Sequence, residues 1–159
     1  MKSSVIKTST VLASFLLAAC LSMHAEVKLP AIFSDGMVMQ QQTNANLWGM
    51  ATPNKKVTVT TGWNGKQYAV TADKNGSWKL SVSTPEAGGP YTNTFDDGTP
   101  KTLNNILIGE LWLCSGQSNM EMPMKGFKNH PVKNANMDIL RSKIPHIRLF
   151  TVKRTSTIT

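Results

Sequence analysis

The stretch Val57-Thr-Val-Thr-Thr-Gly-Trp63, followed by Asn64-Gly65 and a returning segment from Lys66 to Asp73, decides the fold class of this chain. Its β-branched residues alternate with a period of two, which is typical of a strand with one buried face. Asn-Gly between two such segments favours a tight type I′ turn, because both residues tolerate a positive φ. The stretch therefore predicts an antiparallel β-hairpin.

Short strand-like segments separated by turn residues continue on both sides of this hairpin, from residue 26 to about residue 107. Short strands separated by turns every 8–12 residues or so are typical of a β-sandwich, so we expect one over residues 26–107. The expected strands lie at Leu47–Met50, Ser77–Val82, Tyr91–Phe95 and Lys101–Leu107, with a loop from Pro85 to Pro90.

Beyond the sandwich, Ile106 to Cys114 is almost continuously apolar, which fits a strand buried on both faces of a parallel sheet. A short helix is predicted over Met137–Ser142, ended by Pro145, and a second strand over Ile147–Val152. Strand, helix and strand make one βαβ unit, the opening of a doubly wound sheet. One unit cannot bury its own faces, so we expect residues 108–159 to be the incomplete start of an α/β domain.

The N-terminus predicts export. Lys2 and Lys7 precede an apolar stretch, Val11–Leu21, that is too short to span a bilayer but suits a signal peptide over residues 1–25. The sequence fits two alternative processing routes, which are cleavage after Ala25 and lipidation at Cys20 in the segment Leu17-Ala-Ala-Cys20. The expected location is periplasmic, extracellular or, as a lipoprotein with a lipid anchor at Cys20, the outer membrane.

Composition excludes other classes of protein. The net charge is +8, but Lys and Arg are scattered without a basic patch, which argues against nucleic-acid binding. The three histidines are isolated, so we expect no metal site, and no motif calls for a cofactor. Cys114 lies in an apolar run and is expected to be a buried thiol. The sequence gives no indication of oligomeric state.

The four tryptophans are expected to be structural. Strand positions favour core packing for Trp48, Trp78 and Trp112. Trp63 abuts the Asn64-Gly65 turn and is therefore expected to be the most exposed.

One motif carries chemistry. Ser118 follows the apolar run in Cys114-Ser-Gly-Gln-Ser-Asn-Met-Glu-Met-Pro123, where an open α/β sheet places functional groups. Gly116 allows a tight bend before it. Ser118 to Glu121 also matches a capping box, in which Ser118 would only cap a helix. Met120 stands where G-x-S-x-G needs its second glycine, which argues against an ordinary α/β-hydrolase.

The run Gly109-Glu-Leu-Trp-Leu-Cys-Ser-Gly-Gln-Ser-Asn-Met-Glu-Met-Pro123 resembles the first catalytic block of the sialate O-acetylesterase family, which belongs to the SGNH-type hydrolases. Val27 to Gln41 resembles the segment that leads into the β-sandwich preceding the hydrolase domain in bacterial members. Ile147 to Val152 resembles the family's second sheet strand.

The resemblance implies that Ser118 attacks an acetyl ester on an O-acetylated carbohydrate, forming an acetyl-enzyme that water hydrolyses. It implies an oxyanion donor at the Ser118 N–H and supporting roles for Gly116, Gln117 and Asn119. Sialic acid and acetylated xylan fit the motif equally well.

The family supplies its base from a later Asp-x-x-His segment, which this sequence lacks, because Asp138 is followed three residues later by Arg141. His130 and His146 are interpreted as ordinary surface or strand-edge residues. A serine without a base is a weak nucleophile, so we expect little or no esterase activity from this chain alone. The alternative hypothesis is a non-catalytic exported β-sandwich module that binds glycan or protein.

Overall fold

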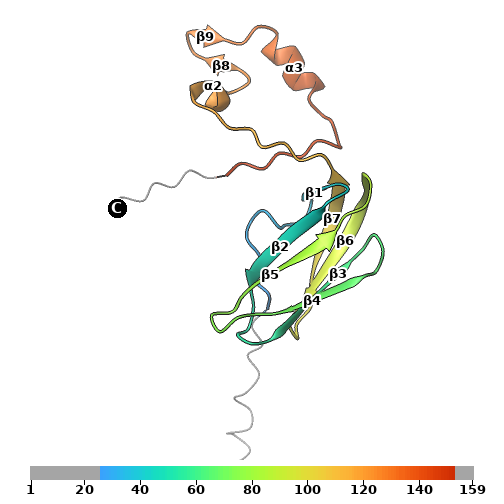
Figure 1. The fold of residues 1–159 in the computed structure, drawn as a ribbon. Helices are drawn as coiled ribbons and strands as arrows, with labels where there is room; N and C mark the ends of the chain where they lie inside the picture. Colours follow the sequence, from blue (N-terminus) through green and yellow to red (C-terminus); the bar gives the residue numbers. More distant parts are fainter. Residues whose placement is uncertain (1–25, 153–159) are drawn as a thin grey trace, which may run out of the picture.

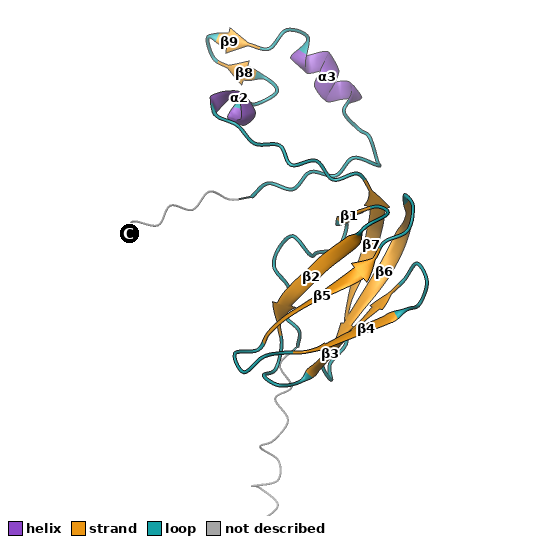
Figure 2. Ribbon diagram, viewed as in Figure 1, coloured by secondary structure: helices purple, strands orange, loops and turns teal. Residues whose placement is uncertain are grey.

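The computed structural model describes residues 26–152, and in this range the chain is built mostly of strands with few helices (Figures 1 and 2). The expected signal peptide, with Lys2, Lys7 and Cys20, lies outside the described residues. The elements are β1 (Val38–Gln40), β2 (Asn44–Met50), β3 (Lys56–Thr61), β4 (Gln67–Thr71), β5 (Ser77–Ser83), β6 (Gly88–Asp96), β7 (Lys101–Gly109), α2 (Ser118–Glu121), β8 (Gly126–Phe127), β9 (His130–Pro131) and α3 (Ala135–Arg141).

Seven of these strands form two sheets. A five-stranded mixed sheet has the order β1-β7-β6-β3-β4, in which β1 and β7 pair in parallel, with Val38 opposite Leu107. The strands β2 and β5 form a separate antiparallel pair, with Leu47 opposite Leu80. We refer to residues 26–109, which contain both sheets, as the sheet region.

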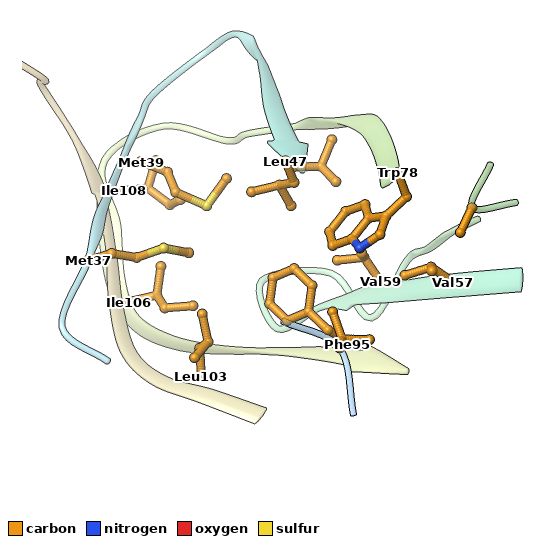
Figure 3. Close-up of a cluster of buried hydrophobic side chains, with 13 residues drawn as sticks. Met37, Met39, Leu47, Val57, Val59, Trp78, Phe95, Leu103, Ile106 and Ile108 are labelled. Carbon is orange, nitrogen blue, oxygen red and sulfur yellow. The ribbon is translucent and has the colours of Figure 1, made fainter. Parts of the chain in front are cut away.

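The hydrophobic core lies between these two sheets, and side chains from both point toward one another in Figure 3. Phe95 on β6 meets Trp78 on β5, with ring centroids 6.2 Å apart. The alternation of burial along each strand explains this arrangement, since every second side chain faces inward. The buried members are Val27, Met37, Met39, Leu47, Val57, Val59, Ala72, Trp78, Val82, Phe95, Leu103, Ile106 and Ile108.

The predicted hairpin is confirmed as the antiparallel pair β3–β4, with Val59 opposite Tyr68. The predicted type I′ turn is wrong, because Gly65 has a φ of 67° whereas Asn64 is not among the residues with positive φ. The strands instead stop earlier, and the Gly65 N–H donates to the Thr61 carbonyl at 2.8 Å. Asn64 Oδ1 accepts hydrogen bonds from the Thr61 hydroxyl and the Lys66 N–H, which stabilises this wider turn.

The expected βαβ unit is absent from the part of the chain that the structure describes. The apolar run expected as a separate buried strand over Ile106–Cys114 is only the end of β7, which stops at Gly109. Residues 147–152 form no strand, although the predicted short helix is present as α3. A strand needs a neighbour for its backbone N–H and C=O groups, and residues 110–114 and 147–152 have none among residues 26–152.

The expectations for three of the four tryptophans are also wrong. Trp78 is buried as expected, but Trp48 is 42% exposed on the outer face of β2 and Trp112 is 83% exposed beyond the end of β7. Trp63 is half-buried rather than the most exposed, because it packs edge-on against Tyr91 with ring centroids 6.0 Å apart.

Replacing Phe95 by alanine is expected to lower the free energy of unfolding by about 3–5 kcal/mol, because it removes a fully buried ring from the contact between the sheets. Urea unfolding followed by circular dichroism measures this loss. Phe127→Ala, at an exposed position of β8, is the matched control and should change the free energy of unfolding by no more than about 0.5 kcal/mol. Equal effects of the two variants would contradict the placement of the core.

Candidate active site

The segment that carries Ser118 begins at a polar junction where the chain leaves β7. Glu110 accepts hydrogen bonds from the side-chain amides of Gln40, at 3.0 Å, and Gln41, at 2.6 Å. The Gln40 side chain also accepts from the Leu111 N–H at 2.8 Å. Donation by Gln41 and then by Gln40 lowers the pKa of Glu110, because both amides stabilise its ionised form. The direction in which the chain leaves the sheet is therefore fixed by side chains at the end of β1.

Ser118 is the first residue of α2, a helix of four residues, and its side chain is exposed. Gln117 occupies the N-cap position, so Ser118 is not the cap that the capping-box hypothesis required. Gln117 and Asn119 flank the serine and are also exposed. In the structure, then, all three polar residues of the motif project from the surface at one short turn of helix.

Gly116 is needed for a close approach rather than for an unusual backbone angle. A Cβ at this position would lie 2.6 Å from Cγ of Met120, closer than side chains tolerate. Its φ is not in the left-handed region. The glycine therefore lets the Met120 side chain fold back over the turn that precedes Ser118.

Cys114 is exposed, so the expectation of a buried thiol is wrong. The same holds for the apolar residues around it, because this segment leaves the sheet and meets no layer of the described structure. From residue 111 to residue 152 the exposed large apolar side chains are Leu111, Trp112, Leu113, Met120, Met122, Met124, Phe127, Met137, Ile139, Leu140, Ile144, Ile147, Leu149, Phe150 and Val152.

The structure brings no general base to Ser118 within residues 26–152. No hydrogen bond joins the Ser118 hydroxyl to a histidine in that range, and His130 and His146 are both exposed. His130 lies in the short β8–β9 hairpin, and His146 in the loop after α3. A shallow pocket of about 250 Å³ lies between β9 and the start of α3, lined by Val132, Ala135 and Met137 among others, and Ser118 is not part of it.

No group of three or more His, Cys, Asp or Glu side chains within residues 26–152 is arranged to hold a metal ion. No helix in the same range is long and apolar enough to cross a membrane.

Comparison with known proteins finds relatives of this chain in one group of enzymes. The chain matches no protein-family model. It is 32% identical over 127 residues to the sialate O-acetylesterase of Mus musculus, a match that covers 73% of this chain and 23% of that protein. The chain belongs to the sialate O-acetylesterase family.

A second curated relative and a solved structure point to the same group of enzymes. The sialate O-acetylesterase of Homo sapiens is 31% identical over 105 residues, covering 60% of this chain and 20% of that protein. The crystal structure of a carbohydrate acetylesterase from Xanthomonas citri superposes with a TM-score of 0.58 at 36% identity, covering 62% of this chain and 23% of that one. This family member thus spans less than a quarter of the length of the curated relatives it matches.

The lowered pKa of Glu110 allows the contacts at the polar junction to be tested by titration. A depressed carboxyl pKa contributes stability that is present above the unfolded value, near 4.3, and is lost as the pH falls through the folded value. We therefore expect an NMR titration of the Glu110 carboxyl to have its midpoint below that of an unfolded glutamate. Gln41→Ala should raise this midpoint more than Gln40→Ala does, because Gln41 has the larger effect on the pKa.

Gln42→Ala is the matched control for this titration, since the Gln42 amide donates to Glu86 and not to Glu110. It should leave the Glu110 midpoint unchanged. A Glu110 midpoint that does not change in Gln41→Ala would contradict the hydrogen bond between Gln41 and Glu110.

Proposed function

We propose that this chain is the nucleophile-bearing part of a carbohydrate O-acetylesterase that removes acetyl groups from sialic acid or another glycan. The observation that carries the proposal is the Gly109–Pro123 block, which contains Ser118, in a chain 32% identical to a sialate O-acetylesterase. The names of the relatives supply the substrate class, an O-acetylated carbohydrate.

We further propose two domains. Residues 26–107 would form a β-sandwich, which is supported by the core enclosed between the two sheets. Residues 108–159 would begin an SGNH-type hydrolase domain, which is supported by the many apolar side chains exposed after residue 110. A hydrolase sheet is covered on both faces, so apolar residues of this kind are what its first strands and helix would contribute.

In the proposed reaction the Ser118 Oγ attacks the acetyl carbonyl carbon while a base takes the hydroxyl proton. The tetrahedral intermediate expels the sugar alkoxide, which is protonated as it leaves, and water then hydrolyses the acetyl-serine. The backbone N–H of Ser118 would stabilise the oxyanion, and Gly116, Gln117 and Asn119 would shape the turn around it. The exposure of Ser118 on α2 supports access by a bulky glycan.

The base and its orienting carboxylate are not supplied by residues 26–152, as neither His130 nor His146 is bonded to Ser118. A serine hydroxyl without a base stays protonated at neutral pH and attacks esters slowly. We therefore propose that the 159-residue chain has little or no activity by itself. We also propose that the chain is exported, with residues 1–25 as signal peptide and with either cleavage after Ala25 or a lipid anchor at Cys20.

The first test assays the 159-residue chain against an O-acetylated sialic acid and 4-nitrophenyl acetate. We expect turnover no faster than that of Ser118→Ala, with Ser115→Ala as the matched control at a neighbouring serine. Robust turnover abolished by Ser118→Ala alone would contradict the proposed inactivity while supporting Ser118 as nucleophile.

The second test determines the coding sequence beyond the Thr159 codon. If the frame continues to an Asp-x-x-His segment, the longer product should deacetylate a glycan, and Ser118→Ala should lower kcat/KM by at least about 10⁴-fold. An active longer product that tolerates Ser118→Ala would refute the assignment. A stop codon at this point would favour the non-catalytic module, which predicts glycan binding by the chain that is indifferent to Ser118→Ala.

A further inference from the structure

Arg148 is held against the sheet region although its neighbours are not. Ile147 is 61% exposed and Leu149 is 92% exposed, whereas Arg148 between them is partly buried. A charged residue that is less exposed than the apolar residues beside it needs a specific partner. In this segment the packing is therefore decided by the guanidinium group.

The partners of the guanidinium group are backbone carbonyls of the sheet region. Nη1 donates to the carbonyl oxygens of Gly36, at 2.6 Å, of Met37, at 3.4 Å, and of Asn105. Nη2 donates to the Asn105 side-chain oxygen at 2.9 Å. We call these acceptors, from Gly36, Met37 and Asn105, the carbonyl socket.

The socket is built by contacts that do not involve Arg148. Gly36 and Asn105, which supply three of the acceptors, both adopt positive φ, 80° and 57°. The Gly36 N–H donates to the Asn104 carbonyl at 3.0 Å, and the Asn104 N–H donates to the Asp35 carboxylate at 2.7 Å. The acceptors are therefore positioned by the sheet region, and their arrangement suits the planar, several-donor geometry of a guanidinium better than an ammonium.

The socket and the Glu110 junction flank the same short strand. Residues 36 and 37 come directly before β1, and Glu110 is bound by Gln40, the last residue of β1, and by Gln41, which follows it. The chain thus leaves the sheet region at one end of β1 and is bonded to it again at the other. Everything between Glu110 and Arg148, including Ser118, forms a loop with two fixed ends.

We propose that Arg148 is a positioning residue that latches the segment 111–147 onto the sheet region, so that β1 sets where Ser118 is carried. Naming Ser118 as the group that is positioned rests on the proposed function, but the latch itself does not. The sheet region is then a scaffold for the nucleophile segment and not only a neighbouring module.

The test places a nitroxide at position 149 of the full chain through Leu149→Cys, with Cys20→Ser and Cys114→Ser to leave one thiol. Leu149 is almost fully exposed, so the label should be tolerated. We expect strong broadening of the amide signals of Gly36, Met37 and Asn105 in the NMR spectrum. Adding Arg148→Ala should lower the ratio of latched to unlatched chains about tenfold or more, because bonds to a charged donor are lost, and the broadening should fall with it.

Three companion variants make the result specific. Arg141→Ala, at an exposed arginine of α3, should leave the broadening unchanged, and so should Ser118→Ala. Arg148→Lys keeps the charge but not the fork of donors, and should recover only part of the broadening. The latch would be overturned if no broadening is seen with Arg148 present, or if the broadening is unchanged in Arg148→Ala. Neither result would bear on the proposed role of Ser118.

A label-free measurement checks the same point. In the unmodified chain, trypsin should cleave after Arg148 more slowly than after Arg141, because the protease must withdraw the guanidinium from the socket. Equal cleavage rates at the two arginines would also overturn the proposal.

Discussion

The contact between Phe95 and Trp78 is the interaction on which the rest of the structure depends. Within the described residues no backbone ladder joins the β2–β5 pair to the five-stranded sheet, so the two sheets are held together by their facing side chains. A two-stranded ribbon is not stable alone in water, and β2–β5 persists because its inner face is buried against the larger sheet. Removing the rings at this contact would therefore weaken the packing of the smaller sheet on the larger one.

The parallel pairing of β1 with β7 connects this core to the candidate active site. The pairing places Val38 beside Leu107 and brings the residues before and after β1 to the same edge as the chain leaving β7. Glu110 and Arg148 both bind at that edge, one as an acceptor of side-chain amides and the other as a donor to carbonyls. The position of the segment 111–147 is thus governed by polar contacts, because the apolar residues of the segment do not pack on the sheet region.

The apolar residues after Glu110 are left exposed, because only polar contacts hold this segment to the sheet region. Trp112 and Leu149 would be unusual on the surface of an isolated soluble domain, where large apolar patches mark surfaces that something else covers. The curated relatives are more than four times as long as the part this chain matches. A proposed hydrolase domain, with layers on both faces of its sheet, would use such residues as its core. As the proposed nucleophile for glycan esters, Ser118 needs no burial, since the substrate would have to reach it from solvent.

The sequence by itself determined the local features of this protein. Alternating β-branched residues predicted the β3–β4 hairpin, and the spacing of turns predicted strands that overlap β2, β5, β6 and β7, because these patterns act between residues near in the chain. The sequence did not predict β1, and the expected loop over Pro85–Pro90 is partly strand, because β6 begins at Gly88. The Gly109–Pro123 block indicated the enzyme family and its candidate nucleophile. Only the tertiary structure decided which apolar residues are buried. Trp112 and Cys114 were expected in the core because they lie in an apolar run, yet no layer covers them among residues 26–152. It alone revealed that β1 pairs with β7 and that Arg148 binds Gly36, 112 residues earlier in the chain, because such contacts depend on distant segments meeting and leave no local pattern.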